Sequence, residues 1–586
     1  MPQRIRGTGL SANSGPVLSS GRIMTEGGFG ARTVLWVCAL AATLAGPVAH
    51  AQQARITLLH TSDVHGNVLP WDDFRNEPGD GSLAQIATLV RQIRAEVDHP
   101  VLLLDSGDTI QGTPLEQFAH VRWGEPSPTI AAMNLMGYDA MAVGNHEFNF
   151  GLEVLRRAER QADFPFLSAN TVSSTDGRPA FPEHMIVKAG DVRVGIIGLV
   201  TPNIPGWERP ENYSGLAFRA MDEVAREQVR RLRDTEGCDL VVVLAHTGFE
   251  TDLSNNSSTD TAYENFGERL SRVPGIDVLL TGHTHNDISP RELNGVIVSQ
   301  PRARGRVLTR IDLELERGAD SWQIASWQGA NIKSAGAAAD PEISETFAEL
   351  HRRVATTLDG PAGETTQPVS VADCRLRDCA ALDLIHQVQL AASHADLSLA
   401  SLLSQHTPDL AAGPVTWRWI YAFYVYPNTL VKVEVTGEQV LDLLEHSARF
   451  YTGLECSVDG HCTVLTDTAI PHYNVDTMAG VSYRVDPTRP VGERVQDVRI
   501  GGLPIGLHDH FTLVCNNYRA AGGGGYPHLA GADQLWQSSA EMTDLIGDFI
   551  ARSGPWQPEV DDNWWLGPLV IAERPVAATH STGADR

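Results

Sequence analysis

The sequence predicts an α/β protein built from two domains, and three observations carry that prediction. At 586 residues the chain is too long for a single hydrophobic core. Between residues 55 and about 315, short β-branched apolar runs alternate with segments of helical periodicity. A polar, Gly- and Ala-rich stretch at 316–336 then interrupts this alternation. Alternating strands and helices predict layers of sheet and helix, with loops at the strand ends.

In the first domain, the strands are expected at six apolar runs bounded by turn residues: Ile56–Leu59, Val101–Leu104, Met141–Val143, Val194–Val200, Leu240–Leu244 and Val278–Leu280. Two segments between them, Leu83–Val97 and Met221–Arg233, carry apolar residues at helical spacing. Ligands of such sheets bind beyond the carboxyl ends of the strands. Functional residues are therefore expected directly after these runs.

The second domain follows a connector. We place the first domain at 55–335, a connector helix and hinge at 336–366, the second domain at 367–575, and a disordered tail at 576–586. The connector should hold a helix at Pro341–Leu358 and a loop at Gly360–Pro368. In the second domain, helices are expected near 380–394 and 437–449, and strands near Leu430–Val435 and Phe511–Cys515.

Residues 1–51 have the pattern of a signal or targeting segment. Arg32 precedes an apolar stretch from Val34 to Ala49, and Ala49-His50-Ala51 fits a small-x-small cleavage site. The stretch is short for a membrane span and Gly46-Pro47 interrupts it, so no stable membrane insertion is expected once the segment is removed. The sequence thus predicts a periplasmic or secreted protein that begins near Gln52.

The charge balance restricts the partners. The formal net charge is −27, and a strongly acidic surface repels polyanions, so a nucleic-acid polymer is not an expected partner. A small anionic substrate can still bind, because bound metal ions dominate the local field of a site. Nothing in the sequence suggests an obligate oligomer, and a monomer is expected.

Six cysteines lie beyond the targeting segment, and export permits disulfides. Cys374 and Cys379 form one close pair in loop-like sequence, and Cys456 and Cys462 form another, so two local bridges are predicted. The two remaining cysteines lie in or beside apolar runs and are expected to be buried thiols, namely Cys238 and Cys515. A zinc site made from cysteines is the weaker alternative.

Five short segments carry the chemistry, and each stands where an apolar run gives way to a turn. They are Asp63-Val64-His65, Gly107-Asp108, Gly144-Asn145-His146-Glu147, His246 and Gly282-His283-Thr284-His285. Any one of them alone is an ordinary polar loop. Together they supply two Asp, one Asn and four His as candidate ligands, and divalent cations of hard or borderline character prefer such oxygen and nitrogen donors. The set suits two metal ions that share one bridging carboxylate.

The order of these segments resembles that of the calcineurin-like metallophosphoesterases. The resemblance implies a four-layer α/β/β/α sandwich over 55–335 and two divalent metal ions, with no choice among Zn, Mn, Fe and Co. It also implies that one ion is bound by Asp63, His65 and His285, that the other is bound by Asn145, His246 and His283, and that Asp108 bridges them. His146 would act with Asn145 in catalysis by protonating or stabilising the leaving oxygen. Glu147 would support the Asn145 loop.

Two segments of the second domain, Tyr424–Thr429 and Asn516–Pro527, resemble the substrate domain of the 5′-nucleotidase family. This implies an α+β substrate-binding domain at 367–575. There Tyr426 and Tyr518 would sandwich a nucleobase and Asn428 would hydrogen-bond its edge, although each tyrosine could instead be a core aromatic.

Three runs, Gly144–Leu152, Tyr426–Thr429 and Asn516–Ala520, resemble those of the exported bifunctional 2′,3′-cyclic-nucleotide 2′-phosphodiesterase/3′-nucleotidases. The sequence also departs from the 5′-nucleotidases, which argues against a standard 5′-monophosphate pocket. Asn149 and Gly524 stand where 5′-nucleotidases carry Asp, and the segment 398–413 contains no Arg. Asn149 cannot supply the negative charge that would raise the pKa of His146, so we expect His146 to hold its proton less strongly than in the 5′ enzymes.

The resulting expectation is an exported dinuclear-metal phosphoesterase acting on small-molecule nucleotides. It would convert 2′,3′-cyclic nucleotides to 3′-nucleotides, and these to nucleoside and phosphate. The alternative is a 5′-nucleotidase or UDP-sugar diphosphatase. A thiosulfohydrolase and a non-catalytic binding relic are the less favoured interpretations of the same fold.

Overall fold

The computed structural model describes residues 52–253, 257–258, 264–319, 321–404, 406–456 and 462–567. The expected targeting segment at 1–51 and the expected tail at 576–586 lie outside these residues. Within the described ranges, no helix has the length and apolar character needed to cross a membrane.

Two six-stranded sheets form the centre of the first domain. The first has the order β18-β17-β1-β4-β5-β6 and the second the order β15-β16-β14-β11-β9-β8. In the first sheet these strands are Trp322–Lys333, Val307–Arg317, Gln53–Thr61, Val101–Asp105, Ala140–Ala142 and Phe166–Leu167. In the second they are Ile288–Leu293, Val296–Gln300, Val278–Thr281, Leu240–His246, Val192–Val200 and His184–Ala189. Strands β1, β4, β5 and β6 run parallel, as do β9, β11, β14 and β16.

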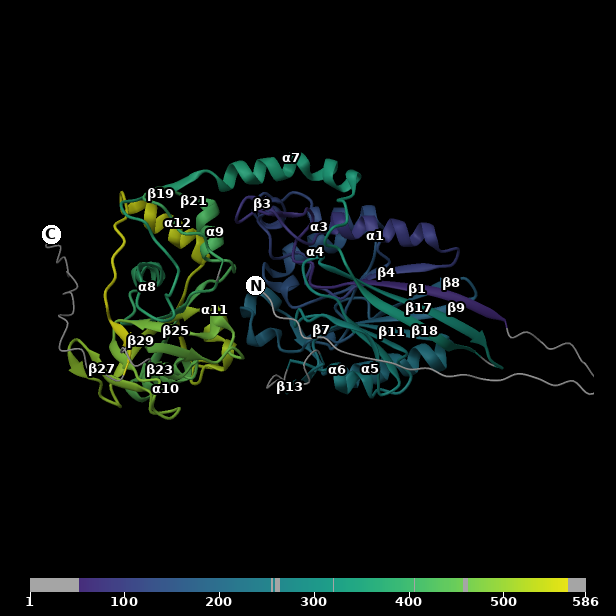
Figure 1. Cartoon of the computed structure of the whole chain (residues 1–586). Coiled ribbons are helices and arrows are strands. Elements are labelled where there is room, and N and C mark those ends of the chain that lie inside the picture. The colour runs from purple at the N-terminus through teal and green to yellow at the C-terminus, as the bar shows by residue number, and fades with distance from the viewer. Residues whose placement is uncertain are drawn as a thin grey trace, which may run out of the picture. The chain divides into compact units, whose positions relative to one another are not determined.

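Alternating side chains pack the two sheets against each other and against helices. Leu58 faces the core between the sheets, whereas its neighbour Leu59 faces helices on the outer side. The outer layers are α1 (Leu83–Glu96), α3 (Pro128–Met136) and α4 (Gly151–Gln161) on the first sheet, and α5 (Met221–Arg230) and α6 (Gly267–Ser271) on the second. Figure 1 shows α1 and α5 on opposite sides of the paired sheets. The predicted four-layer α/β/β/α arrangement is confirmed.

The six predicted apolar runs all contribute to strands, and the helix predicted at 341–358 is α7 (Pro341–Leu358). Two segments differ from the prediction. The polar stretch 316–336 contains β18, an edge strand whose mostly exposed side chains give it little apolar signal. The loop expected at 360–368 contains β19 (Pro361–Thr365), a short strand paired with β21 (Gly413–Thr416). Both differences have one cause, since half-exposed strands lack the continuous apolar run of a buried parallel strand.

Helix α7 packs on the first domain. Its apolar face, formed by Ile343, Phe347, Val354 and Leu358, is buried in the same core as α1 and α3. Asp340 caps its first turn by accepting hydrogen bonds from the N–H groups of residues 342 and 343. The connector helix is thus present, and its action as a hinge stays a prediction.

The second domain is built on a five-stranded mixed sheet with the order β25-β20-β29-β22-β30. These strands are Asp476–Ala479, Leu397–Ser401, His510–Asn516, Leu430–Thr436 and Gln534–Gln537. Its helices include α8 (Ala380–Ser393), α9 (Trp417–Phe423), α10 (Gly437–Ala448) and α12 (Met542–Arg552). Two separate buried clusters fill this domain. The α+β architecture and the helices and strands predicted for it are confirmed.

The cysteines follow the prediction where the structure describes them. Cys374 and Cys379 form a disulfide, and Cys238 and Cys515 are buried free thiols. Strand pairing places Cys456 opposite Cys462, but their side chains lie outside the described set, so the second bridge stays a prediction.

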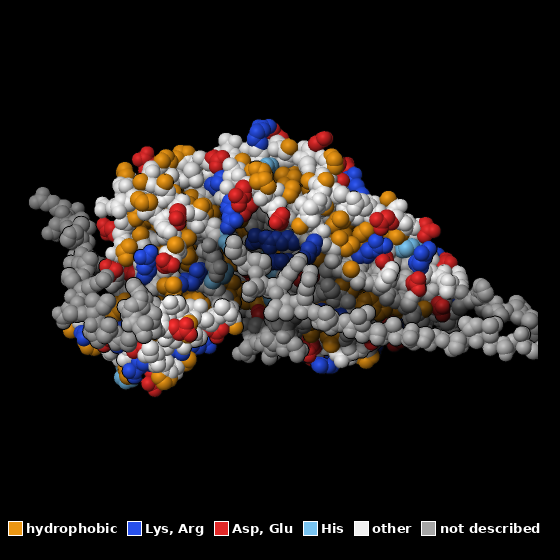
Figure 2. Space-filling view, in the orientation of Figure 1, with side chains coloured by type: hydrophobic (Ala, Val, Ile, Leu, Met, Phe, Trp, Pro, Cys, Tyr) orange, Lys and Arg blue, Asp and Glu red, His pale blue; other side chains and the backbone are white. Residues whose placement is uncertain are grey.

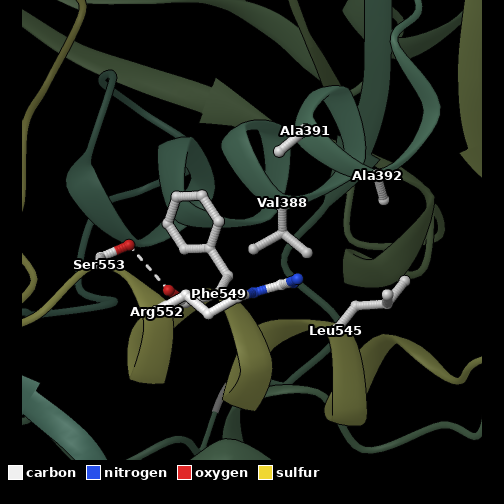
Figure 3. A pocket seen from close by; sticks show the side chains of 7 residues that line it. All are labelled: Val388, Ala391, Ala392, Leu545, Phe549, Arg552 and Ser553. Atoms are coloured by element: carbon white, nitrogen blue, oxygen red, sulfur yellow. Dashed lines mark hydrogen bonds between the residues drawn. The ribbon is translucent and has the colours of Figure 1, made fainter.

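One pocket of the second domain lies between α8 and α12 and has a volume of about 340 Å³. Val388, Leu545 and Phe549 line it together with the Arg552 side chain (Figure 3). It contains no imidazole or carboxylate, so the predicted chemistry lies elsewhere.

On the face shown in Figure 2, basic side chains gather at one hollow, and charges of both signs are interspersed over the rest.

Candidate metal centre

The five predicted segments converge because they follow neighbouring parallel strands. Asp63 and His65 come after β1, Asp108 after β4 and Asn145 after β5, which are adjacent in the first sheet. His246 ends β11, and His283 and His285 follow the adjacent β14 of the second sheet. Parallel strands end at the same sheet edge, so the packed sheets bring all seven predicted ligands together.

The first group of candidate ligands is Asp63, His65 and His285, whose donor atoms lie within 4.8 Å of one another. The Nε2 atoms of His65 and His285 are 3.0 Å apart, and Asp63 Oδ1 lies 3.4 Å from His285 Nε2. Two imidazole nitrogens and a carboxylate oxygen that point at one position form a donor set suited to a divalent cation.

The second group is Asp108, His246 and His283, again with donor atoms within 4.8 Å of one another. Asp108 Oδ2 lies 3.0 Å from His246 Nε2. Asn145 joins this group, because its Oδ1 is 3.0 Å from both His246 Nε2 and His283 Nδ1. The residues present thus fit two metal sites, one of them with an amide oxygen as an additional ligand.

The protonation states of His65, Asp63 and Asp108 fit metal binding, because ligands must present lone pairs. Burial lowers the pKa of His65 to about 3, so its imidazole is neutral at physiological pH. Burial alone would raise the pKa of Asp63 and Asp108. The hydrogen bond and charge of His285 outweigh burial at Asp63, and the charge of His246 does so at Asp108, so both carboxyl pKa values fall below their usual range. At His246 the charge and hydrogen bond of Asp108 outweigh burial and raise the pKa to about 10, so a metal ion would displace a proton from this imidazole.

Backbone carbonyls fix which imidazole nitrogen faces the site. His246 Nδ1 lies 2.7 Å from the carbonyl oxygen of Ser106, and His65 Nδ1 lies 3.0 Å from that of Gln111. A carbonyl only accepts, so Nδ1 carries a hydrogen and Nε2 is the nitrogen that faces the ligand cluster. Sequence reasoning missed Ser106 and Gln111, since a backbone carbonyl has no residue signature.

Five of the seven predicted ligands have left-handed backbone conformations. Their φ angles are 52° for Asp63, 50° for His65, 61° for Asp108, 73° for His283 and 58° for His285. Such conformations cost on the order of 1–3 kcal/mol each for residues other than glycine, and they concentrate at functional sites. The sharp turns after the strands therefore aim these side chains at a common point.

Two motif glycines permit the close packing of these turns. A Cβ on Gly144 would lie 2.3 Å from Asp108 Oδ1, and one on Gly282 would lie 2.0 Å from Ser62 Oγ. Any side chain at either position would displace a ligand loop.

Glu147 ties two ligand loops together, as its predicted supporting role requires. Its side chain is fully buried and accepts hydrogen bonds from four backbone N–H groups. These are Gly144 at 2.6 Å, Asp108 at 2.9 Å, Thr109 at 2.6 Å and Ile110 at 3.3 Å. One carboxylate thus joins the turn that carries Asp108 to the turn that carries Asn145.

His146 stands beside the ligand cluster with its two nitrogens facing different partners. Nδ1 lies 2.7 Å from Asn149 Oδ1, and Nε2 lies 3.9 Å from Asp108 Oδ2. The amide nitrogen of Asn149 in turn donates to Glu208, a buried residue that sequence reasoning missed. Glu208 follows Glu147 by 61 positions and lies in no apolar run. Its connection to His146 through Asn149 is therefore visible only in the folded chain.

The two loops that carry the predicted base-binding residues are adjacent in the second domain. Antiparallel pairing of Leu430 with Asn516 brings their two loops together, and Thr429 N donates to Asn517 Oδ1 at 2.9 Å. The Tyr426 side chain, on one loop, is 37 % exposed. Tyr518, on the other, is half-buried.

Two contacts bear on how these residues would hold a base. A Cβ on Gly523 would lie 2.5 Å from the Tyr518 ring, so the Gly-rich loop supports that ring. The Asn428 main chain turns back on the neighbouring loop residue, because Asn428 N donates to Tyr426 O at 2.8 Å.

Comparison with known proteins matches two family models to separate parts of the chain. Residues 56–287 match the family model described as calcineurin-like phosphoesterase, and residues 354–531 match the 5′-nucleotidase C-terminal domain. The chain is 27 % identical to the 2′,3′-cyclic-nucleotide 2′-phosphodiesterase/3′-nucleotidase of Salmonella typhimurium, over 90 % of this chain and 91 % of that protein. It is 28 % identical to the trifunctional nucleotide phosphoesterase YfkN of Bacillus subtilis, covering 89 % of this chain but only 39 % of that longer protein.

Among solved structures, a putative 5′-nucleotidase from Staphylococcus aureus superposes with a TM-score of 0.77 at 27 % identity. The superposition covers 88 % of this chain and 100 % of that one.

Proposed function

We propose that this chain, which belongs to the calcineurin-like phosphoesterases that carry a 5′-nucleotidase C-terminal domain, hydrolyses 2′,3′-cyclic nucleotides to 3′-nucleotides and then to nucleoside and phosphate. The family is dependent on two metal ions. The observation that carries the proposal is the convergence of seven candidate ligands in two groups. Similarity over nine-tenths of a bifunctional relative's length supports the substrate class.

In this proposal Asp63, His65 and His285 would hold one ion, Asn145, His246 and His283 would hold the other, and Asp108 would contribute to both. The two bound ions supply Lewis acidity, which activates water and neutralises the charge that develops on the phosphoryl oxygens. The role of the protein is to hold the seven donors in a fixed arrangement. The left-handed turns and the Glu147 carboxylate support that role.

His146 would supply the proton that the leaving sugar oxygen needs. As the P–O bond to that oxygen breaks, the hydrogen on Nε2 passes to the oxygen, and the imidazole keeps its other hydrogen on Nδ1. That atom faces Asn149 Oδ1 at 2.7 Å, and an amide oxygen can only accept a hydrogen bond. General acid catalysis of this kind contributes about 10²–10⁴-fold in rate.

The second domain would hold the nucleoside. Stacking of a base on Tyr426 and Tyr518 is worth on the order of 1–3 kcal/mol per base and tolerates any base. Two arginines of the second domain are occupied in other contacts. Arg375 donates to the carbonyl oxygens of Leu402 and His472, and Arg519 is buried in an ion pair with Asp476 at 2.7 Å. With no Arg in 398–413, this supports a pocket other than that of a 5′-monophosphate enzyme.

Export to the periplasm or the medium fits this assignment. The disulfide between Cys374 and Cys379 is typical of an oxidising compartment, and residues 1–51 have the pattern of a targeting segment. We infer an exported monomer that salvages nucleotides.

The test is phosphate release and product analysis with 2′,3′-cyclic AMP, 3′-AMP and 5′-AMP, each with Mn²⁺ and with chelator. The proposal requires metal-dependent turnover of the first two and little of the third. The 5′-nucleotidase alternative, which the Staphylococcus aureus structure favours, requires the reverse order. Equal turnover with chelator would reject both.

A further inference from the structure

A carboxylate lies near His146 and is connected to its imidazole through one intervening residue, Asn149. Asn149 Oδ1 lies 2.7 Å from His146 Nδ1, and Asn149 Nδ2 donates to Glu208 Oε1. The second Glu208 oxygen accepts from Asn212 Nδ2 at 2.9 Å, and the same Asn212 amide donates to the Asn149 carbonyl at 2.8 Å. Two amides and one carboxylate thus form a closed network behind His146.

Glu208 is built into this network rather than placed on the surface. Its side chain is only 9 % exposed, and burial raises its pKa. Both carboxylate oxygens accept amide N–H groups, and within the described residues no lysine or arginine pairs with it at 4.0 Å or less. Burying a carboxylate costs free energy, which the two amide hydrogen bonds and the more distant charges of His146 and Arg209 offset, and its fixed place behind His146 indicates a role there.

The role follows from the two different ends of an amide. A carboxylate only accepts, so the Asn149 NH₂ group must face Glu208 and the Asn149 oxygen must face His146. The oxygen then requires a hydrogen on Nδ1, so Nε2 is left as the nitrogen that carries the proton for the leaving oxygen. Without Glu208 the amide could reverse and present N–H to Nδ1, which would select the opposite imidazole tautomer.

We propose that Glu208 is a positioning residue: it fixes the orientation of the Asn149 amide, and through it the tautomer and direction of His146. The proposal rests on the proposed phosphoester hydrolysis, in which His146 serves the leaving oxygen. It also modifies our expectation from the sequence. Asn149 carries no negative charge, but Glu208, its hydrogen-bond partner, carries one.

Substrates with different leaving groups distinguish this positioning role from a general structural one. Hydrolysis of a nucleotide releases a sugar alkoxide, which needs a proton, whereas hydrolysis of 4-nitrophenyl phosphate releases a phenolate that scarcely needs one. We therefore expect Glu208→Gln to lower kcat on the nucleotide by about ten- to a hundredfold and on 4-nitrophenyl phosphate by less than about threefold. His146→Gln should give the same selective pattern with a larger loss.

Glu211→Gln is the matched control, because it removes one exposed carboxylate three positions away that has no hydrogen bond to Asn149. It should leave both rates unchanged. Asn149→Asp supplies the second test, because the carboxylate it introduces would accept from Nδ1 with either oxygen and would no longer need Glu208. In that background, Glu208→Gln should cost less than about threefold on the nucleotide, since it also relieves repulsion between two carboxylates.

Equal losses on both substrates, or an undiminished loss in the Asn149→Asp background, would overturn the proposal. If Glu208→Gln does not fold, Asn149→Ala tests the same link. A measurement independent of turnover is the ¹⁵N spectrum of histidine-labelled metal-free protein, with His146 assigned by His146→Gln. It should show hydrogen on Nδ1 in the parent protein and a change of tautomer in Glu208→Gln.

The experiment also separates this proposal from the proposed function. If the parent enzyme prefers 5′-AMP, the substrate assignment fails. The leaving-group comparison can then be run with 5′-AMP, whose leaving oxygen is also a sugar alkoxide. If the parent protein turns over no phosphoester, the histidine spectrum alone decides whether Glu208 fixes the tautomer.

Discussion

Glu147→Gln is the substitution for which the structure gives the most detailed expectation. The carboxylate accepts four backbone N–H groups, two on each oxygen, from the turns that carry Asp108 and Asn145. Glutamine keeps one acceptor oxygen and turns an NH₂ group toward donors. Two hydrogen bonds to a charged group are lost, each worth about 1.5–3 kcal/mol, so we expect the free energy of unfolding to fall by about 3–6 kcal/mol.

The same substitution should weaken metal binding, because both turns carry predicted ligands. Loss of such outer support typically costs about 10–100-fold in metal affinity. The assay is equilibrium unfolding in denaturant of the metal-free protein, followed by titration with Mn²⁺ and measurement of bound metal. Amide hydrogen exchange at Asp108, Thr109 and Gly144 should accelerate in the variant.

Glu116→Gln provides the matched control, since Glu116 is another fully buried glutamate of the same domain. Only its Oε2 is used, accepting from Thr129 N at 3.1 Å and Thr129 Oγ1 at 2.6 Å, while Oε1 has no hydrogen-bond partner among the described residues. Glutamine can keep that oxygen in place, so we expect a change within about 1 kcal/mol. If Glu147→Gln costs no more than Glu116→Gln and binds Mn²⁺ equally well, the carboxylate does not hold the two turns together.

Three further predictions concern other parts of the molecule. Mn²⁺ at a hundred times its Kd should stabilise the chelator-treated protein by about 2.7 kcal/mol per site, and Asp108→Asn should reduce this gain in thermal unfolding. Tyr518→Ala should raise KM for nucleotides by about 5–150-fold and leave KM for 4-nitrophenyl phosphate unchanged; equal effects on both would contradict a base clamp. His386 is buried between Ser398 and Thr477 hydroxyls, and burial lowers its pKa to about 3. Its contribution to stability should be complete above pH 6.5 and fall by about 1.4 kcal/mol per pH unit toward pH 4, so His386→Gln should flatten the pH dependence of unfolding relative to the exposed control His508→Gln.

The parts of the fold that could be predicted are those with a distinctive residue pattern along the sequence. Strand β11 is a continuous run of aliphatic residues because a parallel strand is buried on both faces. The ligands were predictable for a related reason, since they follow such runs directly and parallel strands end at one edge. Strand β18 escaped prediction because it is an edge strand whose side chains are mostly exposed.

The supporting residues could not be predicted, because their contacts join segments far apart in sequence. Glu208 meets Asn149 across 59 positions, and His246 meets the carbonyl oxygen of Ser106 across 140. A glutamate in a polar loop and a main-chain carbonyl look the same whether or not they hold a catalytic group. Their roles emerge only from burial and from the direction of each hydrogen bond.

The strained turns explain why the site is organised by the fold itself. Beyond the ends of β1 and β4 the ladder continues: Asp63 N donates to Gly107 O at 2.8 Å, and His65 N donates to Asp108 O at 2.9 Å. Arg304 N donates to Asp63 O at 2.7 Å, so main-chain hydrogen bonds hold the Asp63 turn on both sides. These bonds hold left-handed residues that would otherwise relax, and the donors are therefore positioned by the protein alone. Metal binding then need not organise the turns, and Asp63 and Asp108 should exchange their amide hydrogens slowly even in chelator-treated protein.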